Sequence, residues 1–348
     1  MSLETLSLPL QAFLLFHLNL GFSTLEVEDR RKVIDRCYEP MLQLAKDGVR
    51  PIAVEISGWT LTRLVELAPD WVDRLRTAIG SGRIELVGSG WAQVIGPLVP
   101  KVVNVRNQEL GRQAYLDILG VEPSVALVNE MAFSAGLVDV YEEAGYSGLV
   151  LDRENARAAL GTEDEPAHVS PSAVRGPSGA TLPVAWSDTV LFQRFQRVVH
   201  GEIAVEDYLA MLRSRVETGQ RVLPIYTNDV EVFGHRPGRF MTEAGLNGNE
   251  WARIAEDVFD TAQMRGTAID ILEQTLSDDD LAHAAAFYAS PVFADGMLTG
   301  EQSLPIADEA VRAFIEARVQ NVAPDKRFVY YLMAATGICV VPLSGMNS

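Results

Sequence analysis

The chain has 348 residues, 48% of them hydrophobic and 22% charged, a composition typical of one large or two modest globular domains and not of a disordered chain. Its formal net charge of −18 argues against nucleic acid and anionic membranes as partners, because their phosphate groups would repel it, and favours a neutral substrate. Cys37 and Cys339 lack the spacing of metal ligands, so neither a disulfide scaffold nor a zinc ribbon is indicated.

The first apolar segment of the chain predicts a buried strand. Residues 1–10 carry an acid and no basic segment, so they predict no secretory signal peptide, and a cytoplasmic location is expected. The apolar run at residues 8–20 is interrupted by Gln11, His17 and Asn19 and is too short to span a bilayer.

Short apolar runs then alternate with longer amphipathic stretches, which is the pattern of strand–helix units in a parallel sheet. The predicted strands are residues 8–20, 51–56, 83–87, 124–130, 148–152, 181–186 and 222–226. Pro69 and Asp70 mark a restart within the second helical stretch, and residues 161–179 predict a long loop because they are rich in Pro, Gly, Ser and Ala. The predicted helical stretches are residues 28–47, 59–79, 104–119, 134–144 and 203–217.

The pattern changes near the C-terminus. Residues 247–277 predict a long helix and a short strand, and residues 307–321 and 326–339 predict Ala-rich helices. About seven strand–helix units are too many for a small open sheet and come close to a barrel. We therefore predict an α/β fold, a distorted TIM-like (β/α)7 barrel at residues 1–277, with a small helical extension at residues 278–348 packed on it.

Polar side chains fall within the predicted strands or at their ends, where they would converge on one mouth of a barrel. A charge inside an apolar strand is costly unless it is paired or lines a cavity, so several at one rim indicate a functional pocket. These residues are His17, Asn19, Glu55, Glu85, Glu130, Asp152, Asp188, Asp229 and Glu231.

Some of these acids also have structural explanations. Glu55 and Glu85 can equally be buried partners of arginines such as Arg50 and Arg83. Glu130 can be an acid at a helix N-terminus that interacts with the helix dipole.

The strand predicted at residues 222–226 stops abruptly on Asp229, Glu231 and His235. Because alternate strand residues share a face, both acids would lie on the rim of the sheet. Equally, both acids can simply solvate a loop and cap the segment that follows.

Two carboxyl groups beside aromatic rings are typical of the active sites of glycosidases. In these sites one acid protonates the leaving oxygen, and the other attacks or stabilises the sugar cation. Trp59, Trp91, Phe133, Tyr226 and Phe233 lie next to the proposed rim residues in the sequence. Sugar rings stack on such side chains, although each of them can also be a core residue, and for Phe133 and Phe233 the core is favoured.

Several of these stretches together resemble glycoside hydrolase family 57, whose members include α-amylase-like enzymes, amylopullulanases, branching enzymes and 4-α-glucanotransferases. The family's first motif, of the His-x-His-Gln-Pro type, is similar to residues 16–20, and its second, Gly-x-x-Glu before an aromatic residue, to residues 82–91. The third, which ends a strand on the nucleophilic glutamate, resembles residues 127–133. The fourth, of the Asp-Gly-Glu-x-Phe-Gly-His type, resembles residues 229–235, and the connecting residues 55–58 also look familial.

This resemblance covers about residues 10–275 and implies a (β/α)7 barrel, a carbohydrate substrate and a retaining double displacement, with no metal or other cofactor. It implies that Glu130 is the nucleophile and Asp229 the general acid/base. The other rim residues are then expected to bind substrate: His17, Asn19, Glu55, Trp59, Glu85, Trp91, Asp152, Asp188, Glu231 and His235.

The sequence also departs from the family pattern. Asn19 stands where the first motif has its second histidine, the Gln-Pro that follows is absent, and Val230 replaces the glycine between the two acids. The stretch at residues 334–341, where the family's fifth motif is expected, carries no carboxylate. We therefore expect remodelled outer subsites and a short sugar or glycoside as substrate.

Two other hypotheses remain open at this point. A metal-dependent relative, such as a polysaccharide deacetylase or an α-mannosidase, would need a set of His and Asp ligands, whereas the histidines here are widely scattered. A sugar-binding barrel without activity would explain the missing fifth motif, and retention of both Glu130 and Asp229 opposes it.

Overall fold

The computed structural model describes residues 11–21, 25–47, 51–154, 172–217, 220, 222–235 and 250–255. The predicted C-terminal extension at residues 278–348, most of the helical stretch at 247–277 and most of the loop predicted at 161–179 lie outside these residues. In the part of the chain that is described, no helix is long and apolar enough to cross a membrane.

The described strands form two four-stranded sheets. The first sheet is entirely parallel, in the order β3 (Ile84–Val87), β2 (Ile52–Ile56), β1 (Gln11–Leu18) and β8 (Val222–Asp229). The second has the order β4 (Val125–Leu127), β5 (Gly148–Asp152), β7 (Thr181–Ser187) and β6 (Ser172–Arg175), of which only β6 runs antiparallel. The predicted α/β class with parallel strands is confirmed.

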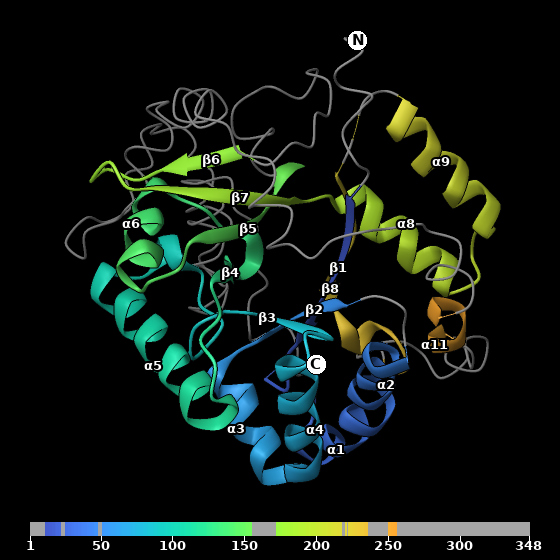
Figure 1. Cartoon of the computed structure of the whole chain (residues 1–348), viewed down its shortest axis with the longest axis horizontal. Coiled ribbons are helices and arrows are strands. Elements are labelled where there is room, and N and C mark those ends of the chain that lie inside the picture. Colours follow the sequence, from blue (N-terminus) through green and yellow to red (C-terminus); the bar gives the residue numbers. More distant parts are fainter. Residues whose placement is uncertain are drawn as a thin grey trace, which may run out of the picture.

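Gly88 joins the two sheets just beyond the end of β3. Its N–H donates to Val125 O at 2.8 Å, and its carbonyl oxygen accepts from Leu127 N at 2.8 Å, which places β4 beside β3. The strands curve around a common interior, with helices on the outside (Figure 1). Because the hydrogen bonds among the described residues define two sheets and no continuous ring, closure into a (β/α)7 barrel stays a prediction.

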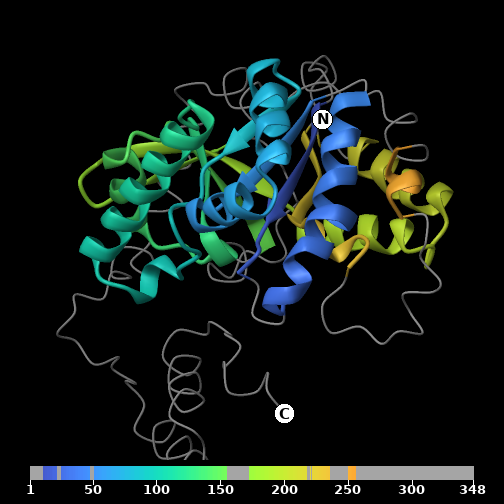
Figure 2. The same ribbon diagram turned by 90° about the horizontal axis from the view of Figure 1, so that it is seen from below.

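Helices connect the parallel strands, as predicted for strand–helix units. They are α1 (Arg30–Val33), a π-helical turn (Ile34–Tyr38), α2 (Glu39–Asp47), α3 (Gly58–Leu67), α4 (Pro69–Gly80), α5 (Lys101–Leu119), α6 (Ala135–Glu143), α8 (Thr189–Val199) and α9 (Val205–Glu217). Helix α11 (Glu250–Arg253) follows β8. Seen at 90° to the first view, β1 passes between the green helices α5 and α6 and the blue helices α1 and α2 (Figure 2).

The boundary between α3 and α4 follows from local chemistry. Ser57 Oγ accepts a hydrogen bond from Thr60 N and so caps the start of α3. Pro69 occupies the first turn of α4, where its missing N–H costs nothing, so the predicted restart at this residue is confirmed.

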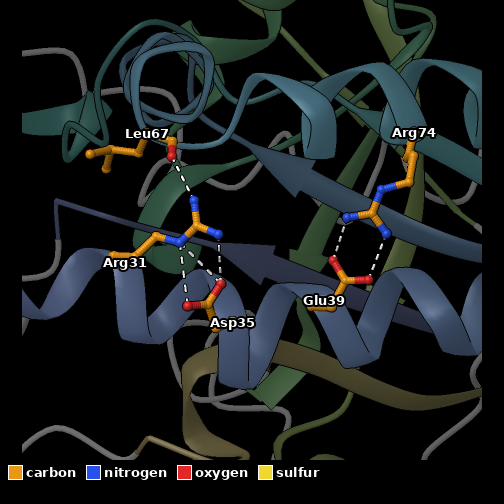
Figure 3. Close-up of polar contacts among 5 residues, drawn as sticks. All are labelled: Arg31, Asp35, Glu39, Leu67 and Arg74. Atoms are coloured by element: carbon orange, nitrogen blue, oxygen red, sulfur yellow. Dashed lines mark hydrogen bonds and ion pairs between the residues drawn. The ribbon is translucent and has the colours of Figure 1, made fainter.

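Exposed polar contacts connect helices α1, α2, α3 and α4. Arg74 of α4 binds the Glu39 carboxylate of α2 through two hydrogen bonds of 2.6 Å (Figure 3). Arg31 of α1 donates to Leu67 O at the end of α3 and also pairs with Asp35 (Figure 3). Exposed pairs contribute about 1 kcal/mol or less, so these contacts orient the helices more than they stabilise the fold.

Two elements differ from the sequence prediction. Strand β6 and helix α8 were not predicted, and β6 begins inside the stretch that was predicted to be a loop. Leu191, Phe195 and Val198 recur at helical spacing on α8 and are buried, and Asp188 caps the helix by accepting from Leu191 N at 3.0 Å. The signal for α8 is therefore present in the sequence, and the prediction of Asp188 as a substrate ligand leaves it out.

The side chains of β1 alternate between two hydrophobic clusters. Leu14 and Phe16 pack on the side of the helices, whereas Phe13 and Leu15 pack with residues of both sheets on the inner side. Because side chains two residues apart share a face, His17 at the carboxyl end of β1 also faces the interior.

Helix α5 packs closely on the loop that follows β3. A methyl group on Gly111 would lie 2.4 Å from the carbonyl carbon of Gly90, and Gly90 itself has a φ of +96°. We expect Gly111→Ala to lower the free energy of unfolding by about 1–3 kcal/mol, because the loop backbone would have to move. Gly80→Ala, which meets no atom within 4 Å, is the control and should be neutral or stabilising in urea denaturation. Equal midpoints for the two variants would contradict this packing.

Candidate active site

Three ionisable side chains stand in one row across the carboxyl ends of adjacent parallel strands. His17 of β1 is in register with Glu55 of β2 on one side and with Asp229 of β8 on the other. Register neighbours in a parallel sheet point to the same face, so the three side chains are directed to the interior together. The sequence predicted all three as rim residues.

His17 forms the middle of this row and is 9% exposed. Burial lowers the pKa of His17 from 6.5 to about 3, so the imidazole is uncharged at neutral pH. Its Nε2 atom is buried and has no hydrogen-bond partner among the described residues. A neutral imidazole with one uncommitted nitrogen can bind a sugar hydroxyl as donor or acceptor.

Glu55 is completely buried, and neither of its carboxyl oxygens has a hydrogen-bond partner among the described residues. Burial raises the pKa of Glu55 to about 8, with smaller contributions from the charges of Asp229 and Glu130 and a partial offset by the nearby Ser89 hydroxyl. Glu55 is therefore a protonated acid at neutral pH. Pairing with Arg83 is not observed, and Arg50 lies outside the described residues.

The buried Glu55 makes stability depend on pH. Above its ordinary pKa of 4.5 the unfolded chain loses this proton, whereas the folded chain keeps it up to about pH 8, so the folded state loses stability as pH rises through this window. We expect Glu55→Gln to melt at a higher temperature than the wild type, and the difference between the two melting temperatures should widen from about pH 5 to about pH 8. The difference in the free energy of unfolding should reach a few kcal/mol, since each pKa unit corresponds to about 1.4 kcal/mol. Glu142→Gln on the exposed side of α6 is the control. A gap that does not change with pH would contradict the burial of a neutral acid.

Glu231 lies in a single helical turn directly after β8 and is 3% exposed. Its Oε1 atom accepts hydrogen bonds from Asn19 N at 2.9 Å and from the Tyr38 hydroxyl. Burial and the neighbouring charge of Asp229 raise the pKa of Glu231 above its ordinary value. Glu231 is therefore not a residue that solvates a loop.

Asp229 ends β8 and is half-buried. Burial raises the pKa of Asp229 above its ordinary value, and the charge of Glu130 raises it further. A carboxyl group that keeps its proton closer to neutral pH is suited to donate that proton to a leaving group.

Glu130 is exposed and lies in a short turn after β4, at Asn129–Met131, whereas α6 begins only at Ala135. It is therefore neither the last residue of a strand, as predicted, nor an acid in the first turn of α6. Glu130 and Met131 have φ angles of 55° and 53°, a conformation that L-residues other than glycine rarely adopt. The charge of Glu130 contributes to the raised pKa of both Asp229 and Glu55, so these three carboxyl groups interact electrostatically.

Asn19 and two tryptophans lie along the same edge. Asn19 Nδ2 donates to Gln93 Oε1 at 2.6 Å, and Trp59 N donates to Trp91 O at 2.8 Å. Both tryptophan rings are partly buried, and the guanidinium of Arg30 lies 5.1 Å from the centre of the Trp59 ring. Their contact with substrate stays a prediction. Tyr226 and Phe233, in contrast, are completely buried core residues.

Two predicted substrate ligands have structural partners. Asp152 Oδ2 accepts from Thr189 Oγ1 at 2.8 Å and from Ser187 Oγ at 3.2 Å. Asp188 is 1% exposed; besides capping α8, it binds Arg215 Nη1 through Oδ2 at 2.5 Å. These contacts fix strand ends and helices, and a direct role of either acid in binding substrate stays a prediction.

Glu85 and His235 stand further from the row. Glu85 is in register with Ala53, which places it two residues before the level of Glu55, and it is half-buried. His235 is half-buried at the end of the fourth motif, where burial lowers its pKa and the charge of Asp29 partly offsets this. Their roles as substrate ligands stay predictions.

The structure adds residues that the sequence did not single out. Tyr38 binds Glu231, Gln93 binds Asn19, and Asn129 precedes Glu130 in the strained turn. The contacts of Tyr38 and Gln93 join segments far apart in the chain, for which a single sequence contains no local signal. Within the described residues, no group of three or more His, Cys, Asp or Glu side chains is arranged to hold a metal ion.

Comparison with known sequences places this chain in a family. The model of glycosyl hydrolase family 57 matches residues 20–244. An α-amylase from Pyrococcus horikoshii is 24% identical over 230 residues, which is 65% of this chain and 35% of that protein. A 63-residue stretch is 51% identical to an uncharacterised aminotransferase from Methanocaldococcus jannaschii, and it covers 18% of this chain and 15% of that protein. The chain thus spans about a third, or less, of these curated relatives.

Solved structures show the same fold at low identity. A 4-α-glucanotransferase from Thermococcus litoralis has a TM-score of 0.58 at 20% identity over 76% of this chain and 38% of that one. The α-amylase AmyC from Thermotoga maritima has a TM-score of 0.59 at 12% identity over 94% of this chain and 87% of that one. Because the family model covers the greater part of the sequence, the chain belongs to glycosyl hydrolase family 57.

Proposed function

We propose that the chain is a retaining glycosidase or transglycosidase that acts on an α-linked sugar, with its parallel strands closed into a distorted (β/α)7 barrel. One observation carries this proposal: Glu130 lies in the turn after β4, Asp229 ends β8, and the charge of Glu130 raises the pKa of Asp229. Such a pair separates the roles of the two acids, because one attacks as a carboxylate while the other keeps a proton to donate.

In the first step, the carboxylate of Glu130 attacks the anomeric carbon while protonated Asp229 gives its proton to the leaving oxygen. The bond to the leaving group breaks, and a covalent glycosyl ester forms on Glu130. In the second step, Asp229 takes a proton from water or from a sugar hydroxyl, whose oxygen attacks the same carbon. The ester bond breaks, Glu130 is regenerated as a carboxylate, and the anomeric configuration is retained.

The neighbours of this pair support a sugar ligand. His17 is neutral with an uncommitted Nε2, and Glu55 is a neutral acid that interacts with the Ser89 hydroxyl. Neutral donors and acceptors suit hydroxyl groups, which carry no charge to pair with. The matched relatives include an α-amylase and a 4-α-glucanotransferase, so an α-glucan or a shorter α-glucoside is the substrate class that we propose.

The anomeric configuration of the first product tests this function. Proton NMR should follow maltotriose or an aryl α-maltoside as it is cleaved, and we expect the α-anomer to appear first, with later mutarotation to the β-anomer. Initial release of the β-anomer would contradict the double displacement. Absence of both hydrolysis and transfer with a panel of α- and β-linked short glycosides would contradict the proposed function itself.

A further inference from the structure

Asn129, the residue that precedes Glu130, is hydrogen-bonded to the loop after β3. Asn129 is 4% exposed, and its Nδ2 atom donates to Ser89 O at 3.0 Å and to Ala92 O at 3.5 Å. Its Oδ1 atom accepts from Ser89 Oγ at 2.9 Å. The side-chain amide of Asn129 therefore binds both the backbone and the hydroxyl of Ser89, a pairing that orients the amide in one way only.

Tyr115 of α5 extends this hydrogen-bond network to a third strand. Its hydroxyl donates to Ile56 O, at the end of β2, over 2.6 Å and accepts from Ser89 N over 3.0 Å. Burial raises the pKa of Tyr115 well above its ordinary value, so the phenol keeps its proton. Tyr115, Ser89 and Asn129 thus connect the carboxyl ends of β2, β3 and β4 through a buried polar network, which is rigid when all its groups are paired.

The network meets the backbone directly before its strained turn. Glu130 and Met131 both adopt positive φ angles, which are unfavourable for residues other than glycine. Such a conformation persists only where neighbouring contacts hold it. Within the turn, Met131 N donates to Val128 O at 2.9 Å. Asn129 lies between these two residues in the chain, and the hydrogen bonds of its side-chain amide hold it in place.

We propose that Asn129, Ser89 and Tyr115 are positioning residues that hold the strained turn and thereby aim the carboxylate of Glu130 at the anomeric carbon. This inference rests on the proposed function. All three side chains are buried, so they act through Glu130 on the rate of attack and not on sugar binding. Small displacements of a nucleophile cost about 10²-fold in rate.

The test compares two buried asparagines. Asn129→Asp keeps the shape of the side chain and removes its N–H donors, and Asn104→Asp is the matched control. Asn104 is 3% exposed, and its Nδ2 atom likewise donates to backbone oxygens, at Gly96 and Val99, further along the same loop. We expect Asn129→Asp to lower kcat by about 10- to 100-fold with KM within about twofold, and Asn104→Asp to keep kcat within about twofold at a similar loss of melting temperature.

Amide exchange of Met131 provides a readout that does not depend on turnover. Asn129→Asp should speed this exchange at least about tenfold, and Asn104→Asp should not, because only the first variant releases the turn. Equal exchange of Met131 in both variants, or equal kcat, would overturn the proposal. If Asn129→Asp does not fold, Tyr115→Phe removes a single hydroxyl and is held to the same two criteria. If Met131 exchanges as expected in both variants but the protein cleaves no glycoside, the proposed function is contradicted. The hydrogen-bond network of Asn129, Ser89 and Tyr115 would then still be established as a support of the turn.

Discussion

Glu130→Gln is expected to lose on the order of 10⁴- to 10⁶-fold in kcat and to form no covalent glycosyl-enzyme, because an amide cannot attack the anomeric carbon. Glu130 is exposed, so this substitution should change the melting temperature little. Steady-state kinetics on an aryl α-glycoside, together with a melting curve, would measure both effects.

Glu142→Gln serves as the control, since it makes the same chemical change on the exposed side of α6. It should leave kcat unchanged. Full activity of Glu130→Gln would show that this residue is not the nucleophile, whereas inactivity of both variants would point to damage of the fold.

Asp229→Asn is expected to lose about 10²- to 10⁴-fold in kcat/KM on substrates with poor leaving groups, and far less on activated aryl glycosides. A poor leaving group needs the proton of Asp229, whereas an activated phenolate departs without it. The structure adds an expectation for pH. Because the pKa of Asp229 is raised, the wild-type enzyme should lose activity as pH rises through this raised value. The variant should lack this alkaline limb of the pH–activity curve.

The experiment compares alkyl and dinitrophenyl glycosides from about pH 4 to about pH 9, a range that extends below and above the raised pKa of Asp229. The same loss on both classes of leaving group would contradict the role of Asp229 as general acid. Persistence of the alkaline limb in Asp229→Asn would assign that limb to another group, such as Glu231 with its raised pKa.

The row of site residues was predictable because strands alternate with a period of two. Single polar residues within apolar runs marked His17 and Glu55, and the register of three parallel strands brings both level with Asp229. Pro69 likewise predicted a helix start through a purely local effect. In each case the physical cause acts over a few residues, so it can be read from the sequence.

Other features depend on contacts that no local pattern contains. The Tyr38 hydroxyl binds Glu231, and the Asn129 amide binds Ser89, although these partners are distant in the chain. The left-handed turn at Glu130 and Met131 also has no sequence signal, because neither residue favours that conformation. Resemblance to a motif identified Glu130, but its backbone conformation is held by tertiary contacts.

Helix α8 illustrates how one residue can mislead. Asp188 follows a strand, as a site residue would, and it also has the chemistry of a helix cap. Its oxygens in fact cap α8 and bind Arg215, so the acid organises the outer helices. The polar residue alone did not distinguish these roles, whereas the apolar spacing of Leu191, Phe195 and Val198 would have done so.

Trapping of the covalent intermediate tests the central claim most directly. The protein would be incubated with a 5-fluoro-α-glucosyl fluoride, digested and analysed by mass spectrometry. We predict one added glycosyl group on the peptide that contains Glu130, and none in Glu130→Gln. A label on Asp229, Glu231 or Glu55, or turnover to an inverted product without any label, would contradict the assignment of Glu130 as the nucleophile of a retaining enzyme.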